Sequence, residues 1–125
     1  MFEPITKRSK QIARQYHCYK SKTRIISNGF VSMGIALPGA IAAKLVNPDK
    51  KVIAVTGDGG FMMNCQELEL AVRIGTPFVT LIFNDKSYEL IKWTQLNRMA
   101  KTATSILATP ISPRLPQASV SQATC

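Results

Sequence analysis

The sequence is poor in the side chains that build metal clusters and disulfide frameworks. It contains one histidine, His17, and three widely separated cysteines, Cys18, Cys65 and Cys125, with no Cys-x-x-Cys pair. This scarcity argues against a zinc site and against a disulfide-stabilised fold. Free thiols fit a reducing compartment, so we expect a cytoplasmic protein. A lone histidine is expected to be structural.

Acidic residues are also few, and the charge is uneven. There are 7 acidic against 16 basic residues, a net charge of +9, and no acidic residue follows Glu89. Seven of the basic residues lie between Lys7 and Arg24. Charge gathered near one end is typical of a solvated arm, and no nucleic-acid recognition motif accompanies it. We therefore assign residues 1–20 to a basic arm or helix and expect no nucleic-acid partner.

Long apolar runs are missing as well. The most apolar stretch, residues 34–46, is too short to cross a bilayer and contains Pro38 and Lys44. The first residues lack the apolar core of a signal peptide. With 125 residues, 46% of them hydrophobic, we expect one domain or part of one, and no membrane partner.

Two short runs without polar alternation predict strands that are buried on both faces of a parallel sheet, at residues 52–56 and 78–83. A shorter β-prone run covers residues 24–27. Helices are predicted between the strands, over residues 32–45, from a cap at Asn64 to a stop at Gly75, and after Tyr88. Strands that alternate with helices predict an α/β fold, a doubly wound parallel sheet with flanking helices.

Two of these helices carry more detailed predictions. In the first, Met33, Leu37, Ile41 and Leu45 recur every four residues and are expected to share a side. In the second, Asn64 is followed three residues later by Glu67, the spacing of a capping box. We expect Leu68, Ala71 and Val72 to form its apolar stripe.

Residues 96–125 change in character. Serine, threonine, alanine, proline and glutamine dominate them, and no helical or strand period survives. This composition predicts a disordered tail. The expected domain organisation is therefore an arm at 1–20, an α/β domain at 21–95 and the tail.

Acidic residues stand where both predicted strands end. Asp58 follows the first strand within Gly57-Asp58-Gly59-Gly60, and Asp85 follows the second. Ligands of parallel α/β sheets lie beyond the carboxyl ends of the strands. Two carboxylates suit Mg²⁺, with a carbonyl near Ser87 as a further ligand, and the glycine amides suit a diphosphate. The alternative is a pair of tight turns, since neither the dinucleotide fingerprint nor the lysine-bearing phosphate loop is present.

Gly57-Asp58-Gly59, then 24 residues, then Asn84-Asp85 resembles the diphosphate-and-magnesium motif of thiamine-diphosphate enzymes. Segments 27–40, 64–69 and 81–85 are similar to the same family. The resemblance is greatest to the large subunit of acetolactate synthase and its relatives, and it extends over about residues 10–95. It implies thiamine diphosphate and Mg²⁺ as cofactors, and a carboligase or decarboxylase acting on 2-oxo acids such as pyruvate.

The resemblance also implies roles for single residues. The metal ligands would be the side chains of Asp58 and Asp85 and the carbonyl of Ser87. The residues that contact the organic cofactor would be Val31 through its carbonyl, Met33 as the prop for the bent cofactor, Gly57, Gly59, Gly60, Asp85 and Tyr88.

Departures from the family bear on activity. The family has three domains, and this chain is long enough for the diphosphate-binding one. The glutamate that activates the cofactor comes from another domain, and none of the four glutamates here matches it. Arg8 stands where a histidine is common, and Glu89 where a glycine usually follows the tyrosine. The similarity stops near Gln95, as in a truncated member. We therefore expect a homo-oligomer or a partner chain that supplies the pyrimidine-binding domain. A remnant without turnover, or a basic binding protein, is the alternative.

Overall fold

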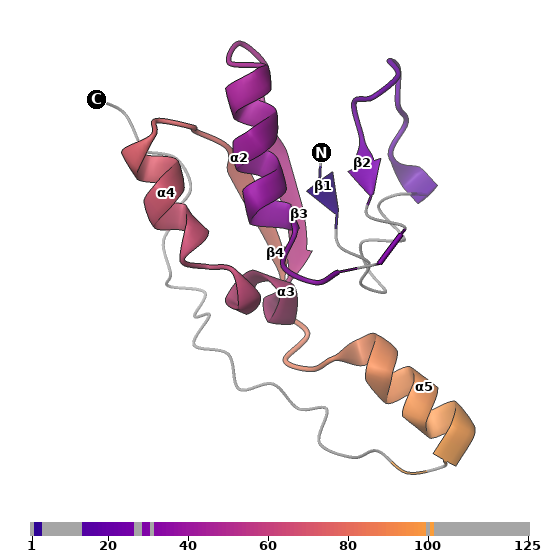
Figure 1. The fold of residues 1–125 in the computed structure, drawn as a ribbon. Coiled ribbons are helices and arrows are strands. Elements are labelled where there is room, and N and C mark those ends of the chain that lie inside the picture. The colour runs from indigo at the N-terminus through magenta and orange to yellow at the C-terminus, as the bar shows by residue number, and fades with distance from the viewer. Residues whose placement is uncertain (1, 4–13, 27–28, 31, 100, 102–125) are drawn as a thin grey trace.

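The computed structural model describes residues 2–3, 14–26, 29–30, 32–99 and 101. Four parallel strands form the sheet: β1 (Phe2–Glu3), β2 (Ile25–Ile26), β3 (Ile53–Gly57) and β4 (Val79–Phe83). The helices are α2 (Ala36–Val46), α3 (Asp58–Met63), α4 (Glu67–Arg73) and α5 (Glu89–Met99). The chain is thus an α/β unit with a parallel sheet and flanking helices, as predicted. Figure 1 shows the arrangement.

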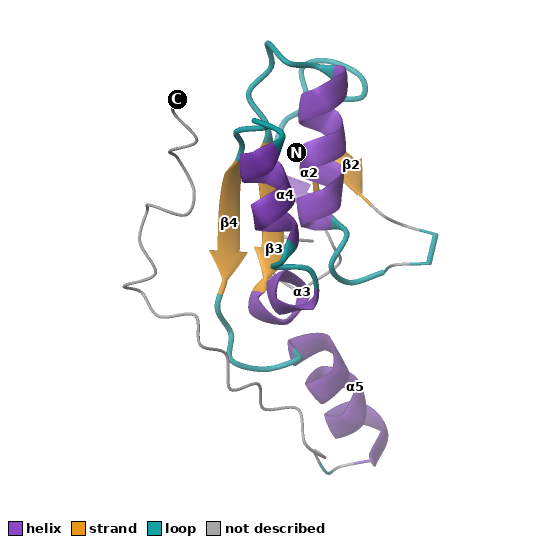
Figure 2. Ribbon diagram, turned by 60° about the vertical axis from the view of Figure 1, so that its left-hand side comes forward, coloured by secondary structure: helices purple, strands orange, loops and turns teal. Residues whose placement is uncertain are grey.

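The strand order in the sheet is β2-β1-β3-β4. The chain passes from β2 over β1 to β3, and from β3 to β4, in the same direction across the sheet. Right-handed crossovers then place their helices on one face. Figure 2 shows α2 and α4 side by side on one face of the sheet, in front of β3, with β4 uncovered beside α4. The step from β1 to β2 runs the opposite way across the sheet, so the direction of winding changes between β1 and β3. Doubly wound sheets bind ligands at such a switch point.

Small side chains hold α2 close to the sheet. Ala36 and Ala40 pack with Val52 and Ala54 in one buried cluster. Leu37 and Ile41 are buried as expected, but Leu45 is 57% exposed and Met33 lies in the turn before the helix. The expected four-residue stripe is therefore correct only in its middle, because the helix begins at Ala36 and its last turn extends beyond the sheet.

The helix between β3 and β4 differs from the prediction at its start. The glycine run was expected to be a turn, but α3 begins directly at Asp58. The expected cap at Asn64 is wrong: α4 begins at Glu67 with Gln66 at its N-cap and no side-chain cap. The side chain of Asn64 donates instead to the carbonyl of Gly34, 3.0 Å away, so a long-range contact has replaced the local one.

The end of α4 follows the prediction. Gly75 adopts φ +65°, and the N–H groups of Gly75 and Thr76 bond to the carbonyls of Val72 and Ala71. This is a Schellman ending, in which glycine avoids the cost of a left-handed backbone. Of the expected apolar stripe, Ala71 is buried, whereas Val72 is 67% exposed.

Strand β4 lies at the edge of the described sheet and is less buried than predicted. Val79 and Leu81 are 43% and 45% exposed, whereas Ala54 and Val55 of β3 are fully buried. The apolar run of β4 predicts cover on both faces, and the described residues supply it only in part. Helix α5 extends away from the sheet and buries none of its residues. It ends at Met99, so it crosses the expected boundary at Gln95, and most of the expected tail and arm lie outside the described residues.

Candidate functional site

The parallel pairing brings the ends of β3 and β4 together. Gly57 pairs with Phe83 at the last register position of the two strands. Asp58 follows Gly57 directly, and Asp85 lies two residues after Phe83. Both acidic residues are therefore at the carboxyl edge of the sheet, where the sequence predicts a ligand site.

Asp58 is buried, with an exposed fraction of 3%, and its carboxylate joins the two strand ends. Oδ2 accepts the backbone N–H of Lys86 at 2.8 Å, and Oδ1 accepts the N–H of Gly59 at 2.9 Å. An ionised carboxylate offers about four lone-pair sites, and these bonds use two of them. Oxygen lone pairs therefore remain for a cation.

Lys86 is the residue that sequence reasoning missed at this edge. Its φ is +53°, a left-handed conformation that costs a residue with a Cβ about 1–2 kcal/mol. That turn presents the Lys86 N–H to Asp58. A contact made by a main-chain group carries no side-chain signal, so the sequence alone gave no reason to select Lys86.

The turn after β4 carries the other predicted metal ligands. Asp85 is half-buried, and the Ser87 hydroxyl donates to the Glu89 carboxylate at 2.6 Å, while its oxygen lies 3.4 Å from the Asp85 carbonyl. Glu89 also lies 3.9 Å from Lys92. The carbonyl of Tyr88 accepts the Lys92 N–H as α5 begins. Glu89, which stands where the resemblance implies a glycine, thus contacts a predicted ligand residue.

The predicted glycine residues are all buried: Gly57 ends β3, while Gly59 and Gly60 lie in the first turn of α3. Helix geometry leaves first-turn N–H groups without partners inside the helix. That of Gly59 is used by Asp58.

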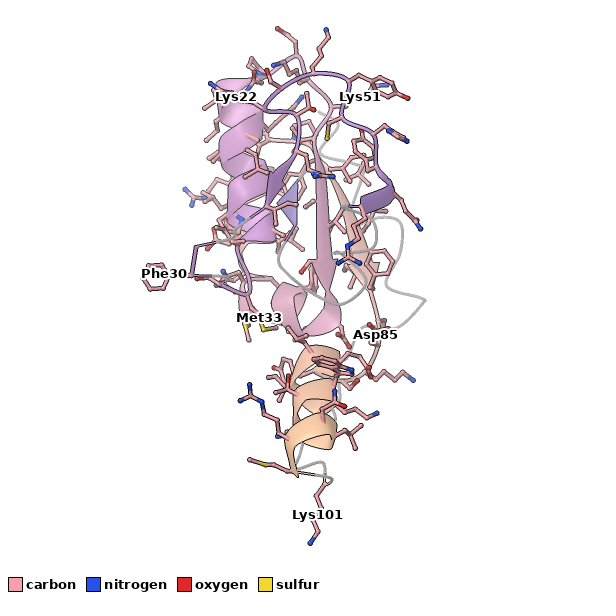
Figure 3. The ribbon with its side chains drawn as sticks, turned by 90° about the vertical axis from the view of Figure 1, so that its right-hand side faces the viewer. Lys22, Phe30, Met33, Lys51, Asp85 and Lys101 are labelled. Carbon is pink, nitrogen blue, oxygen red and sulfur yellow. The ribbon has the colours of Figure 1, made fainter. Side chains whose placement is uncertain are left out.

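Met33 and Asp85 lie at the same end of the molecule, on either side of α3 in Figure 3, whereas Lys22 and Lys51 are at the opposite end. Met33 is half-buried. Val31, the other residue predicted to contact the cofactor's rings, lies outside the described residues, as does Arg8.

The donor set suits a hard cation that is shared with a phosphate. In the part of the chain that the structure describes, no three His, Cys, Asp or Glu side chains gather into a potential metal site. Mg²⁺ commonly takes one or two protein carboxylates and completes its shell with phosphate oxygens and water. The predicted ligands Asp58, Asp85 and a turn carbonyl are of this oxygen type, and both carboxylates are at the same edge of the sheet.

Among the described helices, none is long and apolar enough to span a membrane.

Comparison with known proteins identifies one family. The family model for the C-terminal TPP (thiamine pyrophosphate) binding domain of thiamine pyrophosphate enzymes matches residues 5–118. An acetolactate synthase of Bacillus subtilis is 42% identical over 92 residues, 74% of this chain and 16% of the relative. A catabolic acetolactate synthase of Raoultella terrigena is 45% identical over 80 residues, 64% and 14% of the two chains. A pyruvate oxidase of Lactiplantibacillus plantarum is 42% identical over 72 residues, 58% and 12%.

The chain therefore spans about one seventh of the length of these relatives. The match includes both strand ends and the segment before α2, and it extends beyond the expected range of 10–95 at both ends, so the similarity does not stop near Gln95. The chain belongs to the thiamine pyrophosphate enzyme family, as its C-terminal cofactor-binding domain.

Proposed function

We propose that this chain binds Mg²⁺ and thiamine diphosphate at the carboxyl ends of β3 and β4, as the cofactor-binding part of an acetolactate synthase-like carboligase or decarboxylase. The observation that carries the proposal is the Asp58 carboxylate, which is buried and hydrogen-bonded to the turn after β4. That bond fixes one predicted metal ligand against the turn that holds the others, Asp85 and Ser87.

Each residue has a distinct task in this proposal. Asp58 and Asp85 hold the cation through side-chain oxygens, and Ser87 holds it through its carbonyl. Gly57, Gly59 and Gly60 let the main chain approach the diphosphate closely. Met33 supports the rings on the other side of α3.

Two further residues complete the cofactor set: Tyr88 borders the diphosphate, and the Val31 carbonyl is assigned to the aminopyrimidine by family resemblance. When bound, thiamine diphosphate would supply the chemistry for making or breaking a bond at the oxo carbon of a 2-oxo acid. The residues of this chain position the cofactor and neutralise its charge.

The proposed substrate is a 2-oxo acid such as pyruvate. The proposed assembly is a homo-oligomer, or a complex with a partner chain that supplies the pyrimidine-binding domain. This is supported by the names of the relatives and by the short share of them that the chain spans. We propose a cytoplasmic location, which is supported by the free thiols of Cys18 and Cys65.

The alternative is a cofactor-binding remnant without turnover. It is favoured by the absence of a cofactor-activating glutamate among the four glutamates of the sequence. The two candidates agree on binding and differ only in catalysis.

Calorimetric titration of the full chain with thiamine diphosphate tests the proposal. We expect binding in Mg²⁺ that is lost on addition of chelator and in Asp58→Ala. The matched control is Asp49→Ala, which removes an exposed carboxylate near the end of α2 and is expected to leave affinity unchanged. Binding that ignores both chelator and Asp58→Ala would refute the metal site. Binding without pyruvate turnover would favour the remnant.

A further inference from the structure

Helix α3 makes a side-chain-to-backbone hydrogen bond at each end, and each bond reaches a segment that is distant in sequence. At its start, Asp58 accepts the Lys86 N–H, 28 residues away. Just beyond its end, the Asn64 side-chain amide donates to the Gly34 carbonyl at 3.0 Å, 30 residues away. Two stretches of chain that are distant in sequence therefore meet on one six-residue helix.

The contact at Gly34 is tight as well as polar. Gly34 is buried and adopts φ +87°. A Cβ at this position would lie 2.7 Å from Asn64 Nδ2 and 3.3 Å from Met63 Cβ. The turn before α2 thus rests directly on the end of α3, and only glycine allows this approach.

The Asn64 side chain is held in turn by its own neighbours. Its Oδ1 accepts from Gln66 Nε2 at 3.4 Å, a longer contact than the 3.0 Å bond from Nδ2 to the Gly34 carbonyl. The Asn64 carbonyl accepts the Glu67 N–H. Both the oxygen and the nitrogen of the Asn64 side-chain amide therefore make hydrogen bonds. A residue that acted only as a helix cap would need the oxygen alone.

We infer that Asn64 is a positioning residue that fixes Met33, the neighbour of Gly34, relative to the Asp58 edge of the site. The inference rests on the proposed function, because Met33 matters only if the rings of thiamine diphosphate lie against it. Asn64 itself does not contact the cation or the diphosphate in this arrangement. Its effect is to set the distance between the part of the site that binds diphosphate and the part that supports the rings.

The test compares two ligands on the full chain in excess Mg²⁺. Inorganic pyrophosphate requires the Asp58 edge alone, whereas thiamine diphosphate requires both parts. Asn64→Asp keeps the size of the side chain but replaces the donor with an oxygen that faces the Gly34 carbonyl. We expect it to weaken thiamine diphosphate binding about tenfold, the effect of one lost hydrogen bond, and to change pyrophosphate binding less than about twofold.

Two companion variants make the result decisive. Asn64→Ala, which removes the bond without adding a charge, is expected to show the same selective loss. Asn97→Asp makes the same chemical change at an exposed site on α5 and should alter neither affinity. An equal loss of both ligands in the Asn64 variants would indicate general destabilisation and overturn the inference.

Amide hydrogen exchange of the ligand-free chain separates this inference from the proposed function. We expect exchange over residues 33–36 to accelerate in both Asn64 variants while the amides of β3 stay protected. Failure of the wild type to bind either ligand would refute the proposed function, and the exchange result would still decide whether Asn64 fixes this turn. Unchanged exchange at 33–36 would overturn the role of Asn64.

Discussion

Asp58→Asn separates a structural role of the buried carboxylate from a role in metal binding. The wild-type side chain accepts two backbone N–H groups, at 2.8 and 2.9 Å, with an exposed fraction of only 3%. Asparagine has nearly the same shape but one acceptor oxygen. One of the two N–H groups would therefore face an NH₂ group and lose its partner.

The expected cost follows from these bonds. A hydrogen bond to a charged group contributes about 1.5–3 kcal/mol, and an unsatisfied buried donor costs about 1–3 kcal/mol. The Gly59 bond is local and the Lys86 residue is exposed, so water can replace part of the loss. We expect Asp58→Asn to lower the free energy of unfolding by about 2–3 kcal/mol. At roughly 4 °C per kcal/mol for a domain of this size, Tm falls by about 8–12 °C.

Metal binding adds a second, independent signal in the same thermal unfolding assay. A ligand at a hundred times its Kd stabilises the folded state by about 2.7 kcal/mol. Wild type with Mg²⁺ and thiamine diphosphate is therefore expected to gain roughly 10 °C in Tm. The variant should show no such gain, because Asp85 is then the only carboxylate left and does not hold the cation by itself.

Asp49→Asn is the matched control, since its carboxylate is exposed and lies at the other end of α2. It should change stability by less than about 0.5 kcal/mol and keep the full ligand-induced gain. An Asp58→Asn variant as stable as this control would refute the structural reasoning. A variant that is destabilised but still gains the full shift from Mg²⁺ and cofactor would refute the metal assignment.

Three further predictions test other parts of the structure. Gly34→Ala should lower the free energy of unfolding by about 2–4 kcal/mol in chemical unfolding, because it adds a steric overlap to a strained backbone. Gly75→Ala has the strained backbone but open space around the new Cβ, and it should cost about 1 kcal/mol. Gly29→Ala has open space and no positive φ, and it should change stability very little. Leu81→Lys should reduce self-association in sedimentation, since it charges the exposed edge strand β4, and an unchanged sedimentation profile would contradict this. Glu89→Gln should tighten Mg²⁺-dependent diphosphate binding by about 1.5- to 5-fold at low salt, and a gain that persists at high salt would contradict a charge effect.

Elements that are long enough to show an apolar pattern were predicted from the sequence. The apolar runs located β3 and β4 to within a residue, and Gly75 ended α4 as expected. Strand β1 was not predicted, because two residues carry no alternation and its pairing with β2 and β3 is set by the sheet. Helix α3 was missed since two glycines disfavour a helix locally, and the tertiary contacts at its ends outweigh that preference.

The partial exposure of β4 and α5 has a related cause. An apolar run indicates that the side chains of a strand are buried in the complete protein, but it does not indicate which segment buries them. Leu90, Ile91 and Trp93 of α5 are 40–56% exposed. Val79 and Leu81 of β4 are exposed to a similar degree. The aligned segment is only 16% and 14% of the length of these two relatives, so most of each relative lies outside the part that this chain matches.

The two halves of the candidate site differ in how far sequence can reach them, and the difference is geometric. Parallel strands end at the same edge of a sheet, so a residue just after a strand is placed there whatever the strand order. Asp58 and Asp85 were found by that rule. The contact between Asn64 and Gly34 follows no such rule, because it depends on which loop crosses the end of α3. Asparagine before a glutamate at capping distance gives a local signal that points to the wrong partner. A side chain with a strong local alternative that it does not use is therefore a good place to look for a long-range functional contact.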